Sequence, residues 1–296
     1  MKEKPFSKYQ ILANAVMIIW TLAIILPFIL LFMSSITDEN TLVANGYSFF
    51  PKKFSIASYS YIIKSGGQIL KAYGVSIGVT VVGTLLNVLL SALMAYPLSV
   101  KNLPGRNVMM FFVFFTMLFN GGIVPSYIMW TGTFHIKDTI FAQLLPNFLL
   151  SAWNVMMIRT YFTTSIPDGL YEAAEIDGAS QFTIFWKIVL PLGKPILVTM
   201  GTFAGLAYWN DWTNGLYYIV KNTGLYNVQN LLNQMVQNIQ FLTQSSNSNV
   251  TAAASTIPAT GIQMAIAFVA ILPIMLIFPS FQKYYAKGIA LGAVKG

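Results

Sequence analysis

Six long stretches of the chain are almost continuously apolar. They cover residues 11–33, 73–99, 108–130, 139–161, 195–217 and 259–281, and their central parts contain no Lys, Arg, Asp or Glu. A helix rises about 1.5 Å per residue, so roughly 20 apolar residues cross the ~30 Å hydrocarbon core of a bilayer. The pattern therefore predicts an all-α integral membrane protein with six transmembrane helices.

The composition supports a chain that is surrounded mostly by lipid. Only 9% of the 296 residues are charged, whereas soluble domains have about 25%. Cysteine is absent, which excludes disulfides and thiolate metal sites, and the single histidine, His135, cannot form a metal site by itself. The net charge of +8 is explained by basic residues beside membrane spans, so no nucleic-acid partner is expected.

The distribution of basic residues predicts the orientation. An even number of spans puts both termini on one side, and 11 of the 17 Lys and Arg residues fall on the side of the N-terminus. Positive charge favours the cytoplasm. We therefore expect a cytoplasmic N-terminus at residues 1–10 and a cytoplasmic tail at residues 282–296, whose lysines and glycines make it too flexible and polar for a membrane helix.

The inner loop at residues 162–194 predicts two short helices joined at a glycine. Pro167 and Asp168 favour a helix start, with Asp168 as the capping residue, and Gly178 permits the left-handed conformation that ends such a helix. The loop is either an amphipathic surface on the inner leaflet or a docking surface for a partner protein. Small residues favour the partner, because membrane-surface helices prefer bulky anchors. The first helix carries the apolar residues Leu170, Ala173, Ala174 and Ile176, and the second carries Phe182, Phe185, Trp186 and Val189.

This loop resembles the EAA loop of membrane subunits of binding-protein-dependent ABC importers. The resemblance rests on Glu172-Ala173-Ala174, Asp177-Gly178-Ala179 and the run from Ile188 to Pro191. The C-terminus, Ala95 to Leu98, Trp209-Asn210 and Ser255 to Pro258 resemble the smaller permease of maltose importers. Asn120 to Pro125 resembles permeases for complex oligosaccharides and polysaccharide fragments, such as alginate-like and rhamnogalacturonan-like substrates.

The resemblance implies a permease subunit with the type I ABC importer fold over residues 11–296, in a bacterial cytoplasmic membrane. It implies a homologous second permease, two cytoplasmic ATPase subunits, an extracytoplasmic substrate-binding protein and a carbohydrate substrate. The chain itself has no phosphate-binding Gly-x-x-x-x-Gly-Lys-[Ser/Thr] loop, so it is expected to be non-catalytic, with ATP and Mg bound by the partner ATPase. The residues implied to couple to the ATPase are Glu172, Ala173, Ala174, Asp177, Gly178, Ala179, Phe182 and Lys295.

Polar and aromatic residues within the spans are candidates for a sugar path. Amides bind hydroxyl groups and aromatic faces cover sugar rings, but Asn in membrane helices also commonly bonds a neighbouring helix. The two interpretations remain open at this stage. The candidates are Asn87, Asn120, Trp153, Asn154, Tyr208, Trp209, Asn210 and Asp211.

The alternative function is an ion-coupled secondary sugar transporter, or a channel, that acts without an ATPase. A carrier should place ionisable groups at mid-membrane or show Gly/Pro-broken half-helices in two related halves. The sequence shows neither feature plainly, and a channel would not need the loop at residues 162–194.

Overall fold

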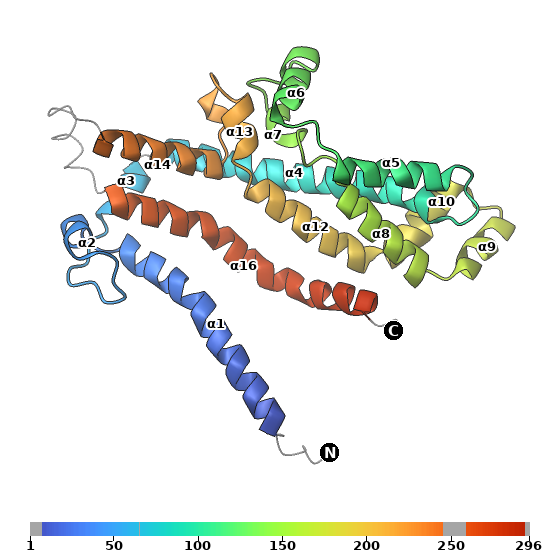
Figure 1. The fold of residues 1–296 in the computed structure, drawn as a ribbon, viewed down its shortest axis with the longest axis horizontal. Helices are drawn as coiled ribbons and strands as arrows, with labels where there is room; N and C mark the ends of the chain where they lie inside the picture. Colours follow the sequence, from blue (N-terminus) through green and yellow to red (C-terminus); the bar gives the residue numbers. More distant parts are fainter. Residues whose placement is uncertain (1–7, 65, 245–258, 294–296) are drawn as a thin grey trace. The chain divides into compact units, whose positions relative to one another are not determined.

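Most of the residues that the structure describes are helical; these are residues 8–64, 66–244 and 259–293 of a computed structural model (Figure 1). The isolated bridge between Thr37 and Phe54 is the only β-type pairing in these ranges. In chain order the α-helices are α1 (Lys8–Ser35), α2 (Glu39–Asn45), α3 (Ala57–Lys64), α4 (Gly66–Ser99), α5 (Arg106–Leu118), α6 (Ile123–Ile128), α7 (Phe141–Leu144), α8 (Ala152–Ser165), α9 (Asp168–Ile176), α10 (Gln181–Ile184), α11 (Leu190–Leu192), α12 (Lys194–Trp209), α13 (Thr213–Tyr218), α14 (Val228–Gln244) and α16 (Ala259–Ala293). Single turns of other helix types lie at η1 (Met129–Thr133), η2 (Phe185–Val189) and η3 (Thr223–Leu225).

Three of the predicted spans are continuous helices. Among the described residues, α1, Gly67–Ser99 of α4 and Thr260–Ile277 of α16 are long and apolar enough to cross a membrane. The most apolar part of α1 has no side chain buried in this chain, as expected for a helix that faces lipid or another subunit.

The third, fourth and fifth stretches are not continuous helices, and this part of the sequence prediction is wrong. Residues 108–130 break at Gly121 and Gly122, where Arg106–Leu118 and Ile123–Thr133 meet at 110°. Residues 139–161 break at Asn147, which has a φ of 67°, and α12 ends at Trp209. Three of the six apolar stretches are therefore broken helices, a feature that the sequence did not reveal.

Two bent pairs of helices affect the number of spans. One is the pair at Gly121 and Gly122, and the other joins Gln181–Leu192 to Lys194–Trp209 at 78°. Counting each bent pair as one span gives up to five in the described residues. The count of six stays a prediction.

The C-terminal segment is helical, although its glycines predict a flexible tail. Helix α16 continues to Ala293, and the last three residues lie outside the described ranges. Because Gly288 and Gly292 lie within this helix, their conformational freedom alone does not end it.

The chain divides into two compact units. The first comprises residues 1–69 and 232–273, and its core is formed by Ile62, Ile262, Ala265 and Ile266. The Glu39 carboxylate accepts hydrogen bonds from the backbone N–H groups of Thr260 and Gly261, at 2.8 and 2.9 Å. A carboxylate at a helix N-terminus bonds free N–H groups and complements the helix dipole. Glu39 thereby joins α2 to the start of α16.

The second unit comprises residues 70–231 and 274–296. Helix α8 packs against α5 and α12 in this unit (Figure 1). Its main core gathers apolar side chains of α4, α8 and the inner loop, with Ile158, Phe162 and Val189 fully buried. Gly83 of α4 allows a close approach of Tyr208, since a Cβ at Gly83 would lie 2.6 Å from Cε2 and 2.7 Å from Cε1 of the tyrosine ring.

We expect Gly83→Ala to destabilise the protein. The Tyr208 ring cannot easily retreat, because its hydroxyl donates a hydrogen bond to the Leu144 carbonyl at 2.9 Å. Overpacking of this kind costs about 1–3 kcal/mol, which exceeds the ~0.5–1 kcal/mol gained by replacing a helical glycine with alanine. The measurement is the thermal unfolding midpoint in detergent, which should fall.

Gly74→Ala is the matched control, because a Cβ at Gly74 of the same helix meets nothing within 4 Å. Its midpoint should stay the same or rise. Equal midpoints for the two variants would show that the contact with Tyr208 is not a tight one.

Candidate functional site

The inner loop has the predicted form of helices joined at a glycine. Helix α9 ends before Gly178, which has a φ of 76°, and α10 follows, capped by the Ser180 side chain. The Ala179 N–H bonds the Ala174 carbonyl at 2.9 Å, which closes the helix end in the way that a left-handed glycine permits. The predicted cap at Asp168 is wrong, because Pro167 occupies the cap position and Asp168 instead pairs with Lys101 at 2.5 Å.

Side-chain hydrogen bonds and ring contacts fix this loop to the end of α4. The Tyr96 hydroxyl donates to Oε1 of Gln181 at 2.6 Å, and Nε2 of Gln181 donates to Oε1 of Glu175 at 2.8 Å. The Tyr96 ring also lies 5.5 Å from the ring of Phe185 and 6.4 Å from that of Tyr171. Burial raises the pKa of the Tyr171 phenol to about 12, so this ring stays neutral. One tyrosine of α4 therefore holds both helices of the loop.

The predicted coupling residues differ in their exposure. Glu172, Ala173, Asp177, Gly178 and Phe182 are exposed, and Ala179 is half-buried. Ala174 is only 8% exposed and packs within the core of its own chain. Ala174 therefore supports the loop from inside rather than contributing to its outer surface, and Lys295 lies outside the described residues.

Two large apolar side chains stand out from the loop surface. Ile176 is 86% exposed and Phe182 is 68% exposed. The apolar pattern predicts Ile176 and Ala174 on one face, but residues two apart in a helix point in nearly opposite directions. Helical spacing could have revealed this outward position. The exposed surface formed by Glu172, Ala173, Ile176, Asp177 and Phe182 is named the loop surface below.

The candidate path residues do not form one site. Asn87 and Asn154 are 2% and 5% exposed, and Nδ2 of Asn154 donates to Oδ1 of Asn87 at 2.7 Å. Nδ2 of Asn87 donates in turn to the Phe148 carbonyl at 2.6 Å. These bonds favour the helix-packing interpretation for this pair.

The other six candidates divide by exposure. Tyr208, Trp209 and Asp211 are buried, and Oδ1 of Asp211 accepts from the backbone N–H groups of Thr213 and Asn214 at the start of α13. The exposed candidates are Asn120, in the break between α5 and α6, Trp153, at the start of α8, and Asn210, at the end of α12. Of the eight candidates, these three are the ones whose polar or aromatic groups lie on the surface of the chain.

A buried network of amide side chains was missed by the sequence analysis. Nε2 of Gln143 donates to Oδ1 of Asn230 and to the Leu225 carbonyl, both at 3.2 Å, and its Oε1 accepts from Nδ2 of Asn227 at 3.3 Å. Nδ2 of Asn227 also donates to the Asp211 carbonyl at 2.6 Å, and that of Asn230 to the Trp212 carbonyl. These amides join α7, the break after α12 and the start of α14. Gln143 lies more than 80 positions from Asn227 and Asn230, so local sequence patterns do not reveal these bonds.

Asp138 anchors the neighbouring loop. Its carboxylate accepts hydrogen bonds from the backbone N–H groups of Lys221, Val220 and Asn222, at 2.7, 2.7 and 3.2 Å. These bonds, foremost that from Lys221, hold the pKa of Asp138 below its usual value. In the described residues no group of three or more His, Asp or Glu side chains is placed to hold a metal ion.

Comparison with known proteins gives matches along nearly the whole chain. Residues 72–291 match the family model described as a binding-protein-dependent transport system inner membrane component. Protein LplC of Bacillus subtilis (strain 168) is 36% identical over 272 residues, 92% of this chain and 90% of that protein. The polygalacturonan/rhamnogalacturonan transport system permease protein YtcP of the same strain is 35% identical over 288 residues, 97% of this chain and 98% of that protein. A chain in a crystal structure of a bacterial ABC transporter involved in the import of the acidic polysaccharide alginate has a TM-score of 0.79 and 26% identity, covering 96% of this chain and all of that one.

We expect Gln143→Met to destabilise the second unit. Methionine keeps the side-chain volume but removes every hydrogen bond of the amide, which leaves Oδ1 of Asn230 and the Leu225 carbonyl without this donor. An unsatisfied buried polar group costs about 1–3 kcal/mol. The free energy of unfolding in mixed detergent micelles should fall by about that amount.

The matched control is Gln237→Met in α14, where the exposed amide bonds Asn233, four residues away, and no other described residue. Surface changes of this kind are usually within about 0.5 kcal/mol of neutral. If Gln143→Met is as stable as this control, the network does not contribute to holding the broken helices.

Proposed function

The chain belongs to the family of binding-protein-dependent transport system inner membrane components, and from this premise we propose that it forms half of the translocation path of an ATP-driven importer for an oligosaccharide or polysaccharide fragment. The family is described as a membrane component of transport systems, and relatives such as YtcP are named as permeases rather than enzymes. The predicted all-α permease fold is confirmed by the family match and by the structural match over 96% of the chain. Membership also favours the importer over the ion-coupled carrier and the channel.

The substrate class is inferred from relatives that match nearly the whole chain and whose names refer to oligosaccharides or polysaccharides. One is named as a permease for polygalacturonan and rhamnogalacturonan, and the solved structure is of an importer of alginate. Further relatives in Bacillus subtilis and Halalkalibacterium halodurans are named as permeases for arabinooligosaccharides. A chain similar to all of these along its length is best explained as a permease for complex carbohydrate.

The loop surface supports docking of a cytoplasmic ATPase. Exposed side chains as large as those of Ile176 and Phe182 gain free energy when a partner covers them, and Glu172 and Asp177 add negative charge that suits a basic partner. The bonds from Tyr96 through Gln181 to Glu175 would transmit movement of the loop to α4. In this proposal both termini are cytoplasmic, and ATP and Mg bind to the ATPase rather than to this chain.

The remaining partners follow from the same proposal. A homologous second permease would complete the path, and an extracytoplasmic binding protein would deliver the carbohydrate. Of the candidate path residues, Asn120, Trp153 and Asn210 are exposed and are the ones available to meet the substrate or the second permease.

The energy source tests the proposed function directly. The chain purified from membranes in mild detergent should be recovered with a second permease and two ATPase subunits. In vesicles with the binding protein outside, uptake of an acidic oligosaccharide should require ATP inside and should persist when a protonophore collapses the proton gradient. Uptake by this chain alone, driven by a proton gradient, would instead establish the carrier.

The docking role of the loop surface is tested by alanine substitution. Phe182→Ala and Ile176→Ala each remove an exposed apolar anchor, so the fold should be kept while the affinity for the ATPase falls by about 2 kcal/mol, or roughly thirtyfold. The measurements are recovery of the ATPase with the permease and carbohydrate-stimulated ATP hydrolysis in vesicles. Tyr96→Phe should retain the ATPase but reduce the stimulation, because the link from α4 to Gln181 is lost.

Two controls match these variants. Phe50→Ala removes a phenylalanine that is 86% exposed between α2 and α3, and Tyr161→Phe removes a half-buried hydroxyl of α8. Both should behave as the unmodified protein. Full ATPase recovery and stimulation in Phe182→Ala and Ile176→Ala would mean that the loop is a passive surface.

A further inference from the structure

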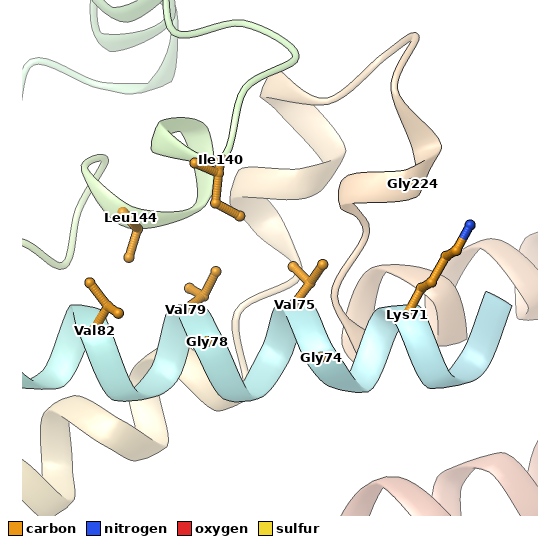
Figure 2. A pocket seen from close by; sticks show the side chains of 9 residues that line it. All are labelled: Lys71, Gly74, Val75, Gly78, Val79, Val82, Ile140, Leu144 and Gly224. Atoms are coloured by element: carbon orange, nitrogen blue, oxygen red, sulfur yellow. The ribbon is translucent and has the colours of Figure 1, made fainter. Parts of the chain in front are cut away.

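A narrow apolar groove runs along one face of α4. The cavity measures about 460 Å³, within the range of sites that hold small organic ligands. Figure 2 shows one wall formed by successive turns of α4 and the other by Ile140 and Leu144, with Gly224 near one end. The residues of α4 that line it are Lys71, Gly74, Val75, Gly78, Val79 and Val82.

The groove is kept open by glycine. A Cβ placed on Gly74 or Gly78 would meet no atom within 4 Å, so neither glycine is required by a close neighbour in this chain. Val75 lies between the two glycines along the helix, and Val79 and Val82 follow Gly78 on the same side (Figure 2). Beyond Lys71, the side chains that line the groove are aliphatic and offer no hydrogen-bond donor or acceptor.

The length of the groove matches one leaflet of a bilayer. From Lys71 to Val82 the helix advances eleven residues, which is about 16 Å at 1.5 Å per residue. Half of a ~30 Å hydrocarbon core is about 15 Å. Lys71 lies two residues before the predicted span at residue 73, so the groove begins at headgroup level and extends to mid-membrane.

Lys71 gives the groove a charged end. It is the only ionisable residue that lines the cavity, and within the described ranges its exposed side chain has no hydrogen bond or ion pair. Two carboxylates of the same unit bond the main chain instead: Asp138 accepts from backbone N–H groups, and Asp211 is buried at the start of α13. An anion from outside the chain is thus the natural partner of this amine.

We propose that the groove binds one acyl chain of an anionic phospholipid, with the lipid phosphate on the Lys71 amine. The length of the groove fits an acyl chain of a single leaflet. The groove has a cationic side chain at one end and aliphatic side chains along the rest. A sugar is a poor occupant, since the valine and glycine walls offer no partners for hydroxyl groups. A helix of the second permease would leave Lys71 without an anion and is tested as the alternative. In the orientation proposed above, the lipid belongs to the outer leaflet.

The test is lipid binding to the importer purified with its partner subunits. A phosphatidylglycerol probe with a photoreactive group on one acyl chain is compared with a phosphatidylcholine probe of the same chains, without ATP or carbohydrate. Labelling should map to residues 71–82, with phosphatidylglycerol favoured by about fivefold, the contribution expected of one lysine near an anionic headgroup. Inorganic phosphate should not displace the probe.

Two variants separate charge from shape. Lys71→Gln should remove the preference for phosphatidylglycerol while keeping labelling by both lipids. Gly78→Leu fills the groove and should reduce labelling by both lipids at least tenfold. The matched controls are Lys64→Gln in α3 and Gly67→Leu at the start of α4, an exposed lysine and a glycine with open space that do not line the cavity.

Three results would overturn the proposal. The first is equal labelling of the unmodified protein and of Gly78→Leu, and the second is a preference for phosphatidylglycerol that survives Lys71→Gln. The third is exclusion of both probes from the assembled importer together with crosslinking of a photoreactive residue at position 78 to the second permease, which would make the groove a subunit interface. Because no transport is measured, failure here leaves the proposed import function untouched.

Discussion

Backbone groups inside a membrane must find hydrogen-bond partners within the protein, because hydrocarbon supplies none. This chain breaks its helices near Gly121, Asn147 and Asn210, and each break releases carbonyl and N–H groups. At the end of α12 the released carbonyls of Asp211 and Trp212 are bonded by Asn227 and Asn230, and Gln143 connects those two amides. The position of α7, α13 and the start of α14 depends on this network.

Three carboxylates of the chain serve the same need. Glu39 bonds two N–H groups of α16, Asp138 bonds three consecutive N–H groups and Asp211 bonds two at the start of α13. Two other carboxylates form surface ion pairs, Asp38 with Lys53 and Asp168 with Lys101. Within the described residues Lys71 has neither kind of partner, and a phospholipid is the anion that a membrane supplies to it.

At the inner loop, side-chain bonds give rigidity without covering the loop surface. Hydrogen bonds among Tyr96, Gln181 and Glu175 connect α4 to both helices of the loop, and Ala174 packs inside. These contacts restrict the movement of the loop backbone, so Ile176 and Phe182 are held in exposed positions. A preorganised apolar surface loses little conformational entropy when a partner binds. This arrangement is well suited to receiving force from an ATPase and passing it to a membrane helix.

Composition, hydropathy and short motifs are enough to predict the membrane class, the apolar stretches, the glycine turn at residue 178 and the permease family. Each of these depends on composition or on residues close together in the chain, which hydropathy and spacing report directly. The folded chain alone shows which stretches are continuous and where the others break, that Ala174 faces inward and that Asn87 and Asn154 bond each other. Hydropathy averages over a broken helix as easily as over a straight one. Whether a break is stable depends on partners such as Gln143 and Asn227, which lie 84 residues apart and are brought together only by the folded chain.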